Sequence, residues 1–496
     1  MEDVTSFGVL AGALGLVVLL AVLSNRLSAL LRIPAPAFFL VAAAVAAWLA
    51  PSLGHALSIE LVQRIVTVAL VVILFDGGMH IGRDRFRQAA GAIVWLGVAG
   101  TFVTAGAVAG CAHVLFGLDW RLALLLGAAV APTDPAVVFS VLGRREVTGR
   151  TGVLLEGESG ANDPVGIALL VALLDAAGSS GAGALGTVVL EFVLQMAVGA
   201  AVGLAGGLAL EFFIRRLRLP GEGLYPLRTL ASAFLLYGVA TAAHGSGFLA
   251  VFVAGIVVGG VRAPYQREVE RFHGSLASLG EIVAFTVLGL SVSLPTLPSG
   301  RAWEIGLVLA VLLAFVIRPL LVGVLLLPVR LNPGERVFVL WSGLKGAVPI
   351  LLGTFILTSG LHGTTRVYDI VLVVVAFSVI VQGGLVPWVA RRAGVPMRTV
   401  EPRPWALGVR LRDEPRGVHR YTVAAGAVAD GARLDEIDLG DGGWFSFVRR
   451  SGQLVPVRHD TVLRAGDEVI VHTHPDDDAD PGPLFTDQDR PPAAGG

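Results

Sequence analysis

Long apolar runs, separated by short polar segments, make up most of the chain. A helix that crosses the hydrocarbon core of a bilayer needs about 20 mainly apolar residues. By this measure the pattern predicts thirteen membrane helices, at residues 7–24, 30–50, 60–80, 89–115, 120–142, 152–174, 184–214, 226–244, 247–261, 281–295, 303–328, 337–358 and 367–390. We therefore expect an all-α polytopic membrane domain over residues 1–397. Because Glu2 and Asp3 precede the first run, we interpret that run as an uncleaved membrane helix rather than a signal peptide.

Arginines orient the predicted helices because they are concentrated in alternate loops. One set of loops holds Arg26, Arg32, Arg83, Arg85, Arg87, Arg144, Arg145, Arg150, Arg215, Arg216, Arg218, Arg262, Arg267, Arg271, Arg330, Arg336, Arg391 and Arg392. The opposite loops hold little more than Arg121, Arg301 and Arg366. The positive-inside rule makes the arginine-rich side cytoplasmic. We therefore expect the amino terminus outside and the carboxyl terminus in the cytoplasm.

The last hundred or so residues differ in character, because the apolar runs stop and charge density rises. Short strand-like segments follow at Tyr421–Ala425, Trp444–Arg449, Leu454–Val457 and Glu468–Thr473. We expect a linker over residues 398–417 and a small α+β cytosolic domain over 418–475. The acidic, Pro/Gly-rich residues 476–496 predict a disordered tail.

The composition fits a membrane protein and excludes several other classes. Hydrophobic residues make up 54% of the chain and charged residues 15%, against about 25% charged residues in soluble domains. The net charge of -1 gives no reason to expect a nucleic-acid partner. A single cysteine, Cys111, excludes an intrachain disulfide framework.

One short motif suggests an enzyme, but the reading is weak. Gly157-Glu158-Ser159-Gly160 resembles the serine motif of intramembrane proteases, with His244 as a candidate base. The motif is short, and a hydrolase would leave Asn162 and Asp163 without a role. We therefore expect neither an enzyme nor a bound cofactor.

Two of the predicted helices contain residues that interrupt helices. Pro132 and Pro135 remove backbone donors from the fifth, and Gly343, Gly346 and Pro349 weaken the twelfth. If helix seven is a linker, these are the fifth helices of two six-helix halves, which then have opposite orientations in the membrane. Interrupted helices at corresponding places in two halves indicate a transporter binding site. The pattern predicts two inverted repeats whose broken helices cross.

The charges in these helices suit such a crossing. Broken helices direct positive amino ends and negative carboxyl ends into the membrane. Asp134 would offset the positive ends, and Lys345 the negative ones. Lys345 is also the only lysine in the chain. The alternative is that Lys345 merely extends its ammonium group to the membrane interface.

Helix six carries its polar residues on two neighbouring faces. Ser159 and Asp163 are four residues apart, as are Glu158 and Asn162. We assign Ser159 and Asp163 to an ion, and Glu158 to an ion pair with Arg318. Asp163 then remains the unpaired carboxylate, able to hold either a proton or a desolvated cation but not both. The alternative is a purely structural, hydrogen-bonding carboxylate.

Three motifs together resemble one family. They are Pro-Thr-Asp-Pro at 132–135, Glu-Ser-x-x-Asn-Asp at 158–163 and Gly-Leu-Lys-Gly-Ala-Val-Pro at 343–349. The chain over residues 7–395 is similar to the cation:proton antiporter-1 family, of the bacterial NhaP type. The resemblance implies a homodimer in contact with membrane lipid, with separate dimerisation and core domains. It also implies an elevator-like movement of the core, within a bacterial cytoplasmic membrane.

The resemblance also implies which residues hold the ion. Asp163 would be the proton- and cation-binding carboxylate, with Ser159 and the backbone of Thr133 as further ligands of the transported alkali cation. Asp76, after Phe75 at the end of helix three, stands where glutamate is often found and is another candidate ligand.

A second set of residues would support the site. Asp134 and Asn162 would hold its ligands, and Glu158 and Arg318 would form a structural ion pair. Lys345 keeps the charge of the arginine that many relatives have there, without its forked geometry. The Asn-Asp pair, rather than two aspartates, is the pattern associated with electroneutral exchange.

The carboxyl-terminal segment resembles the TrkA-C (RCK-C) domain of potassium channels and transporters. The similar stretches are 432–439 and 460–470. The combination resembles the potassium/proton antiporters called cell-volume-regulation protein A, which implies roles in cell volume and pH homeostasis and a small-molecule regulatory ligand. We expect potassium/proton exchange. The alternatives are a sodium/proton antiporter with the same site and a ligand-gated cation channel.

Overall fold

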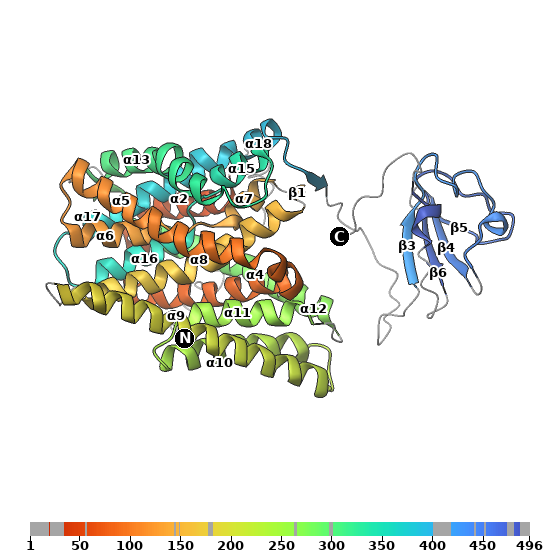
Figure 1. Ribbon diagram of the computed structural model, residues 1–496, viewed down its shortest axis with the longest axis horizontal. Coiled ribbons are helices and arrows are strands. Elements are labelled where there is room, and N and C mark those ends of the chain that lie inside the picture. Colours follow the sequence, from red (N-terminus) through yellow and green to blue (C-terminus); the bar gives the residue numbers. More distant parts are fainter. Residues whose placement is uncertain are drawn as a thin grey trace, which may run out of the picture. The chain divides into compact units, whose positions relative to one another are not determined.

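The computed structural model describes residues 19, 34–54, 57–142, 145–147, 149–176, 182–261, 265–296, 301–399, 418–440, 443–450, 453–473 and 481–486. The chain forms two compact units, Met1–Pro402 and Arg403–Gly496. The first unit is helical, and its long helices run side by side (Figure 1). The first predicted membrane helix, residues 7–24, lies outside the described residues except for Leu19.

The helices of the first unit overlap the predicted spans from the second to the thirteenth. They are α2 (Ala35–Leu49), α3 (Pro51–Gly54), α4 (Ile59–Trp95), η1 (Leu96–Gly100), α5 (Thr101–Phe116), α6 (Trp120–Val130), α7 (Pro135–Leu142), α8 (Arg150–Asp175), α9 (Ala182–Arg216), α10 (Leu224–Ala242), α11 (Gly247–Gly259), α12 (Gln266–Leu290), α13 (Ala302–Leu312), η5 (Leu313–Val322), α14 (Gly323–Leu325), α15 (Pro333–Trp341), α16 (Ala347–Thr358), α17 (Thr364–Phe377), η6 (Ser378–Gln382) and α18 (Gly383–Arg392). One prediction is corrected: α12 begins at Gln266 rather than at residue 281, so Arg267 and Arg271 lie on a helix and not in a loop.

Within the described part of the chain, six helical stretches are long and apolar enough to cross a membrane. They are Ile59–Phe116, Trp120–Leu142, Leu185–Arg216, Gln266–Leu290, Ala302–Leu325 and Thr364–Arg392. The helical domain predicted from the sequence is therefore confirmed, while the count of thirteen membrane helices stays a prediction. The third and fourth predicted spans share one helical stretch, which is interrupted at Gly82, where φ is 64° and ψ is 166°.

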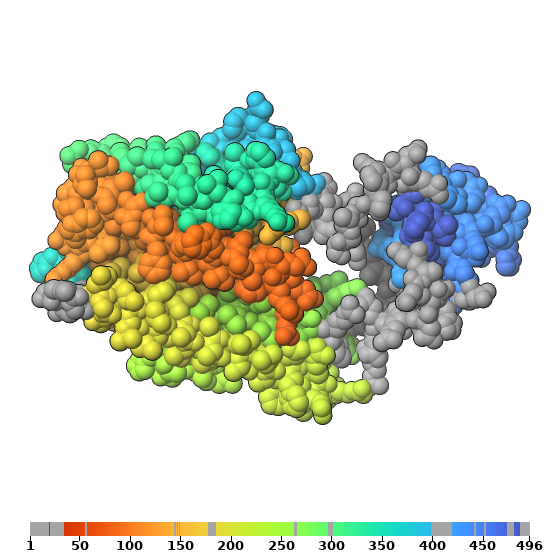
Figure 2. Space-filling model, viewed as in Figure 1, coloured from red at the N-terminus to blue at the C-terminus, as the bar shows by residue number. Residues whose placement is uncertain are grey.

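Apolar side chains also cover the outside of this unit. Helix α9 exposes Leu185, Val189, Leu190 and Val193, each by more than half, and Figure 2 shows this helix at the surface. Soluble proteins rarely expose such a continuous apolar surface. The surface is instead suited to lipid or to another apolar partner.

The carboxyl-terminal unit is a four-stranded antiparallel sheet. Its strands are β3 (Val418–Thr422), β4 (Trp444–Arg450), β5 (Gln453–Val455) and β6 (Glu468–His472), in the order β3-β6-β4-β5. Val448, Val469 and Val471 alternate inward and form the core together with Leu463. The small β-containing domain expected at this end of the chain is confirmed.

Two predicted boundaries are corrected by the structure. Residues 481–486, expected to be disordered, are folded, because Phe485 is fully buried in the core of the sheet domain. The backbone N–H of Ala424 donates to Phe485 O at 2.9 Å. Residues 398 and 399, expected in the linker, belong to strand β2 (Met397–Thr399), which pairs antiparallel with β1 (Arg145–Val147).

An ion pair between a partly exposed arginine and a buried carboxylate is expected to stabilise the sheet domain. Arg450 donates to both carboxylate oxygens of Asp467, at 2.8 and 2.7 Å, and the Asp467 side chain is 1% exposed. Burial alone would raise the pKa of Asp467, but the bonds from Arg450 and from the Arg464 backbone lower it below its ordinary value. A carboxyl group with a lowered pKa in the folded state contributes stability above its unfolded pKa of about 3.9, and that contribution is lost as pH falls through the folded pKa.

We predict that Asp467→Asn lowers the free energy of unfolding of the fragment 403–496 by about 2 kcal/mol at neutral pH. Urea unfolding followed by circular dichroism measures this. The difference between wild type and variant should shrink as pH falls below about 4. The control is Asp435→Asn, since Asp435 pairs with Arg433 at the surface and should contribute less than about 1 kcal/mol. Equal effects of the two substitutions would contradict the prediction.

Candidate ion-binding site

Two interrupted helices meet at the centre of the site. One break lies between α6 and α7, where Pro132 and Pro135 lack backbone N–H groups, and the other lies between α15 and α16. The backbone N–H of Asp134 donates to Leu344 O at 2.8 Å, which joins one break directly to the other. The unwound segments therefore satisfy each other's backbone groups, as an apolar environment requires.

Glycine is needed where the breaks approach their neighbours. A Cβ atom on Gly346 would lie 1.8 Å from Asp134 Oδ2, and one on Gly343 would lie 2.0 Å from Arg318 Nε. Such separations are far shorter than van der Waals contact, so any side chain at either position would displace a charged group. These glycines thus allow the contact as well as interrupting the helix.

Charged side chains occupy the helix ends at the breaks. Lys345, 1% exposed, donates from Nζ to Ala131 O at 2.8 Å and to Pro132 O at 3.0 Å. These carbonyls lie at the carboxyl end of α6, where the helix carries partial negative charge. Asp134 Oδ1 accepts from the N–H of Ala136 at 2.9 Å, at the positive amino end of α7. Each side chain therefore faces a helix end of opposite charge.

Helix α8 holds the first break through Thr133. Ser159 Oγ donates to Thr133 O at 2.6 Å. Asn162 accepts from Thr133 N at 3.2 Å through Oδ1 and donates to Thr133 Oγ1 at 2.7 Å through Nδ2. All three residues are buried. One helix therefore fixes both the backbone and the side chain of Thr133.

Asp163 is the carboxylate at the centre of this arrangement. It lies one turn after Ser159 on α8, is 7% exposed, and its Oδ1 is buried without a hydrogen-bond partner. The negative charge of Asp134 and the positive charge of Lys345 both act on it. A buried carboxylate oxygen without a partner is costly, so a proton or a cation at this oxygen would be stabilising.

Glu158 and Arg318 form a buried ion pair behind the site. Arg318 Nη2 donates to Glu158 Oε1 at 2.8 Å, and each side chain is 5% exposed. Arg318 also donates to Leu340 O at 2.9 Å and to Val339 O at 3.3 Å, at the carboxyl end of α15. The pair therefore connects α8 to the second break.

The structure thus brings together most of the residues predicted from the sequence. They are Thr133, Asp134, Glu158, Ser159, Asn162, Asp163, Arg318 and Lys345. Asp76 lies on α4, where its Oδ2 is 3.3 Å from His80 Nδ1 and its Oδ1 is buried without a hydrogen-bond partner. Among the described residues, no hydrogen bond or ion pair joins Asp76 to the others.

Sequence reasoning missed three polar residues near the site. Ser378 and Gln382, four residues apart in an apolar run, contact the second break. Glu281 on α12 carries a buried oxygen without a hydrogen-bond partner, and the charge of Asp134 acts on it. A polar side chain inside an apolar run was the available signal in each case.

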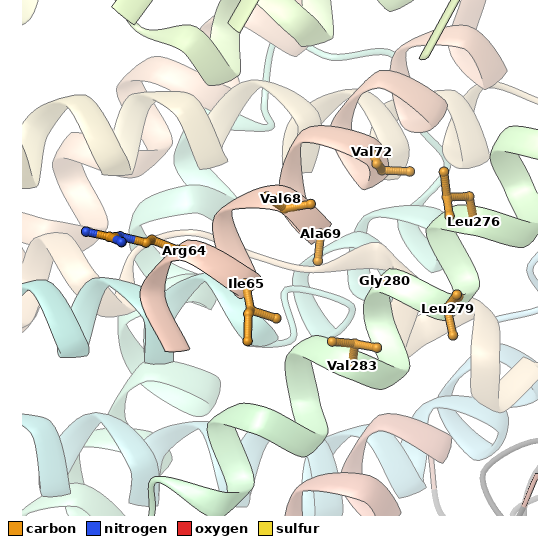
Figure 3. A pocket seen from close by; sticks show the side chains of 9 residues that line it. All are labelled: Arg64, Ile65, Val68, Ala69, Val72, Leu276, Leu279, Gly280 and Val283. Atoms are coloured by element: carbon orange, nitrogen blue, oxygen red, sulfur yellow. The ribbon is translucent and has the colours of Figure 1, made fainter. Parts of the chain in front are cut away.

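A separate groove is not suited to hold an ion. Its volume is about 340 Å³, and it lies between α4 and α12 (Figure 3). Its lining is apolar except for Arg64, whose side chain points away from the other lining residues. It offers no side-chain oxygen ligand, in contrast to the region around Asp163.

The fold and site together define a membrane transporter, and comparison with known proteins agrees. Residues 15–392 match the family described as sodium/hydrogen exchanger, transmembrane. The chain therefore belongs to the sodium/hydrogen exchanger family, and it is a transporter rather than an enzyme.

Relatives within this family cover most of the chain. It is 32% identical over 411 residues to the K(+)/H(+) antiporter NhaP of Alkalimonas amylolytica, covering 82% of this chain and 71% of that one. It is 31% identical over 412 residues to the K(+)/H(+) antiporter NhaP2 of Shewanella sp. strain MR-4, covering 82% and 70%. The fold resembles that of the sodium proton antiporter MjNhaP1 of Methanocaldococcus jannaschii, with a TM-score of 0.62, 22% identity, and coverage of 75% of this chain and 98% of that one.

We predict that Glu158→Gln lowers the stability of the detergent-solubilised protein by about 3–5 kcal/mol, because it leaves Arg318 buried without its counter-charge. A thermal-unfolding assay measures this as a lower midpoint. Glu304→Gln is the matched control, because Glu304 pairs with Arg301 at the surface and should cost less than about 1 kcal/mol. Equal midpoints for the two variants would show that the buried pair is not needed.

Proposed function

We propose that this protein is a secondary antiporter that exchanges a monovalent alkali cation, preferentially potassium, for protons across a bacterial cytoplasmic membrane. The observation that carries the proposal is the buried Asp163, with an oxygen that lacks a partner, beside two crossing helix breaks. Family membership supports the same reaction class. We propose Asp163 as the group that alternates between the proton and the cation.

The ligands proposed for the cation are oxygen atoms around Thr133. They are the carboxylate of Asp163, the hydroxyl of Ser159 and the backbone carbonyl of Thr133, which Ser159 already contacts. Oxygen ligands suit a hard alkali cation. Asn162 and Asp134 fix the backbone that presents them, through their bonds to Thr133 and Ala136.

Competition at one carboxylate is sufficient for exchange. Lys345 and Asp134 offset each other, which leaves one negative charge on Asp163. A proton and a monovalent cation neutralise it equally, so the loaded site carries the same net charge in both cases. We therefore propose electroneutral exchange of one proton for one cation.

Alternating access is proposed to use two groups of helices. In the first group, α4 and α9 pack on α11, and α2 packs on α12. In the second group, α5 packs on α6, and α17 packs on α13 and α16. Helix α8, which carries Asp163, contacts both α4 and α6. We propose that the second group moves as the core of an elevator against the first. We further propose that the protein is a homodimer. Each protomer would have thirteen membrane helices in two inverted repeats, with its amino terminus outside.

Potassium is favoured because relatives that are more than 30% identical are named K(+)/H(+) antiporters. Carbonyl and carboxylate oxygens also bind sodium, so a sodium/proton antiporter is the alternative within the same mechanism. The small sheet domain, residues 418–475, is proposed as a TrkA-C-like regulatory domain that binds a small molecule. We propose that the exchange serves cell volume and pH homeostasis.

We predict that the wild-type protein in everted membrane vesicles moves protons in response to added potassium, and that Asp163→Asn abolishes this response. The reason is that an amide neither binds a proton in this range nor neutralises a cation. A pH-sensitive dye reports the movement. The matched control is Asp175→Asn at the exposed end of the same helix, which should leave the response unchanged.

Further measurements separate the alternatives. A response to sodium alone would keep the mechanism and change the ion. A permeant anion that collapses the membrane potential should leave the rate unchanged if exchange is electroneutral. Cation flux that persists without a proton flux in the opposite direction, and survives Asp163→Asn, would favour a channel and contradict the proposal.

A further inference from the structure

Two polar side chains at the second helix break have no part in the site as described above. Ser378 and Gln382 form the two ends of η6, a π-helical turn between α17 and α18. They are 3% and 5% exposed. A hydroxyl and an amide are costly to bury in a membrane protein unless their hydrogen bonds are made. The hydrogen-bond partners of Ser378 and Gln382 therefore indicate the role of these two residues.

Gln382 holds the carboxyl end of α15. Its Nε2 donates to Trp341 O at 2.7 Å, and its own backbone oxygen accepts from Trp341 Nε1 at 3.1 Å. The last carbonyls of a helix have no partner within the helix. Arg318 donates to the carbonyls of Val339 and Leu340. Gln382 donates to the next carbonyl along the chain, that of Trp341.

Ser378 holds the other side of the same break. Its hydroxyl accepts from the backbone N–H of Lys345 at 2.9 Å and donates to Gln382 Oε1 at 3.2 Å. Because the hydroxyl has one proton, this bond to Gln382 leaves its lone pairs free for Lys345. The same bond fixes the Gln382 amide, with its oxygen toward Ser378 and its nitrogen toward Trp341.

We propose that Ser378 and Gln382 act as one positioning unit, which fixes both sides of the second break and thereby places the ammonium group of Lys345. The inference rests on the proposed exchange at Asp163 and adds two residues that neither bind the ion nor carry charge. The connection runs from Gln382 through Ser378 to the Lys345 N–H, and from Lys345 Nζ to Ala131 O and Pro132 O beside Thr133. The spacing of four residues, on a turn wider than an α-helix, places both groups at the break.

The test compares variants of Gln382 and Ser378, singly and together, in the vesicle assay for cation-driven proton movement. Gln382→Leu keeps the approximate volume but removes both amide contacts, and we expect about a tenfold lower exchange rate at every pH. Gln382→Glu keeps the shape but can donate to Trp341 O only while its carboxyl group is protonated. Normalised to wild type, its rate should therefore be close to normal at the acidic end of the range and fall as pH rises. Two charged side chains are bonded at the same break, Lys345 to Ala131 O and Arg318 to Leu340 O, and both are therefore already engaged there.

The control is Gln195→Leu, which removes another buried glutamine, on α9 away from the break, and should leave the rate unchanged. The double variant Ser378→Ala/Gln382→Leu should lose no more than the more severe single variant, because the two residues act as a unit. Folding is checked by size-exclusion chromatography in detergent. A variant counts as folded when it elutes as the wild-type species does and is recovered at the wild-type yield.

Two outcomes would overturn the inference without touching the proposed function. One is wild-type exchange in Gln382→Leu. The other is a pH profile of Gln382→Glu that is parallel to that of Gln382→Leu. If the wild-type protein itself moves no protons in response to potassium or sodium, the proposed function fails instead, so the two failures are distinguishable.

Discussion

The structure of this transporter depends on satisfying backbone groups where two helices are interrupted inside an apolar domain. Each break exposes carbonyl and N–H groups that water would satisfy at a protein surface. Here the partners are other parts of the chain: Asp134 N–H on Leu344 O, and the Lys345 ammonium on the carbonyls of Ala131 and Pro132. The charged residues at the breaks are thus required by the backbone itself, whatever further role they have in transport.

This requirement explains how an ionisable group remains unpaired in the middle of the domain. Lys345 and Asp134 form hydrogen bonds to helix ends. Arg318 pairs with Glu158 and donates to a carbonyl at the end of α15. Asp163 is left with a buried oxygen that has no partner. A proton or a cation at that oxygen would offset the cost of its burial, so the constraint that builds the breaks also accounts for the site that we propose for exchange.

Much of this could be predicted from the sequence, because the informative residues are rare in apolar segments. Prolines and glycines located the breaks, the only lysine indicated a charged partner, and residues four apart on α8 indicated its two polar faces. The roles of these residues in transport stay predictions, although their positions in the structure are consistent with them.

The parts that could not be predicted depend on contacts between distant segments. Gln382 and Ser378 carry no charge, and their partners are backbone atoms about 30–40 residues away, which no local pattern reveals. Phe485 lies in an acidic, Pro/Gly-rich stretch that is typical of disorder, and only its burial against the sheet shows that residues 481–486 are folded. The resemblance makes Asp76 a candidate ion ligand, and its contact with His80 on the same helix was not evident from the sequence; its role as a ligand stays a prediction.

The buried position of Lys345 has a practical consequence for chemistry on this protein. Since every other basic side chain apart from histidine is arginine, an amine-directed reagent has only the Lys345 ε-amino group and the α-amino terminus to modify. With Lys345 1% exposed, acylation at that position requires the crossing of the two breaks to open to solvent. The rate of acylation at Lys345 would therefore report how often the crossing opens, and no engineered residue is needed for the measurement.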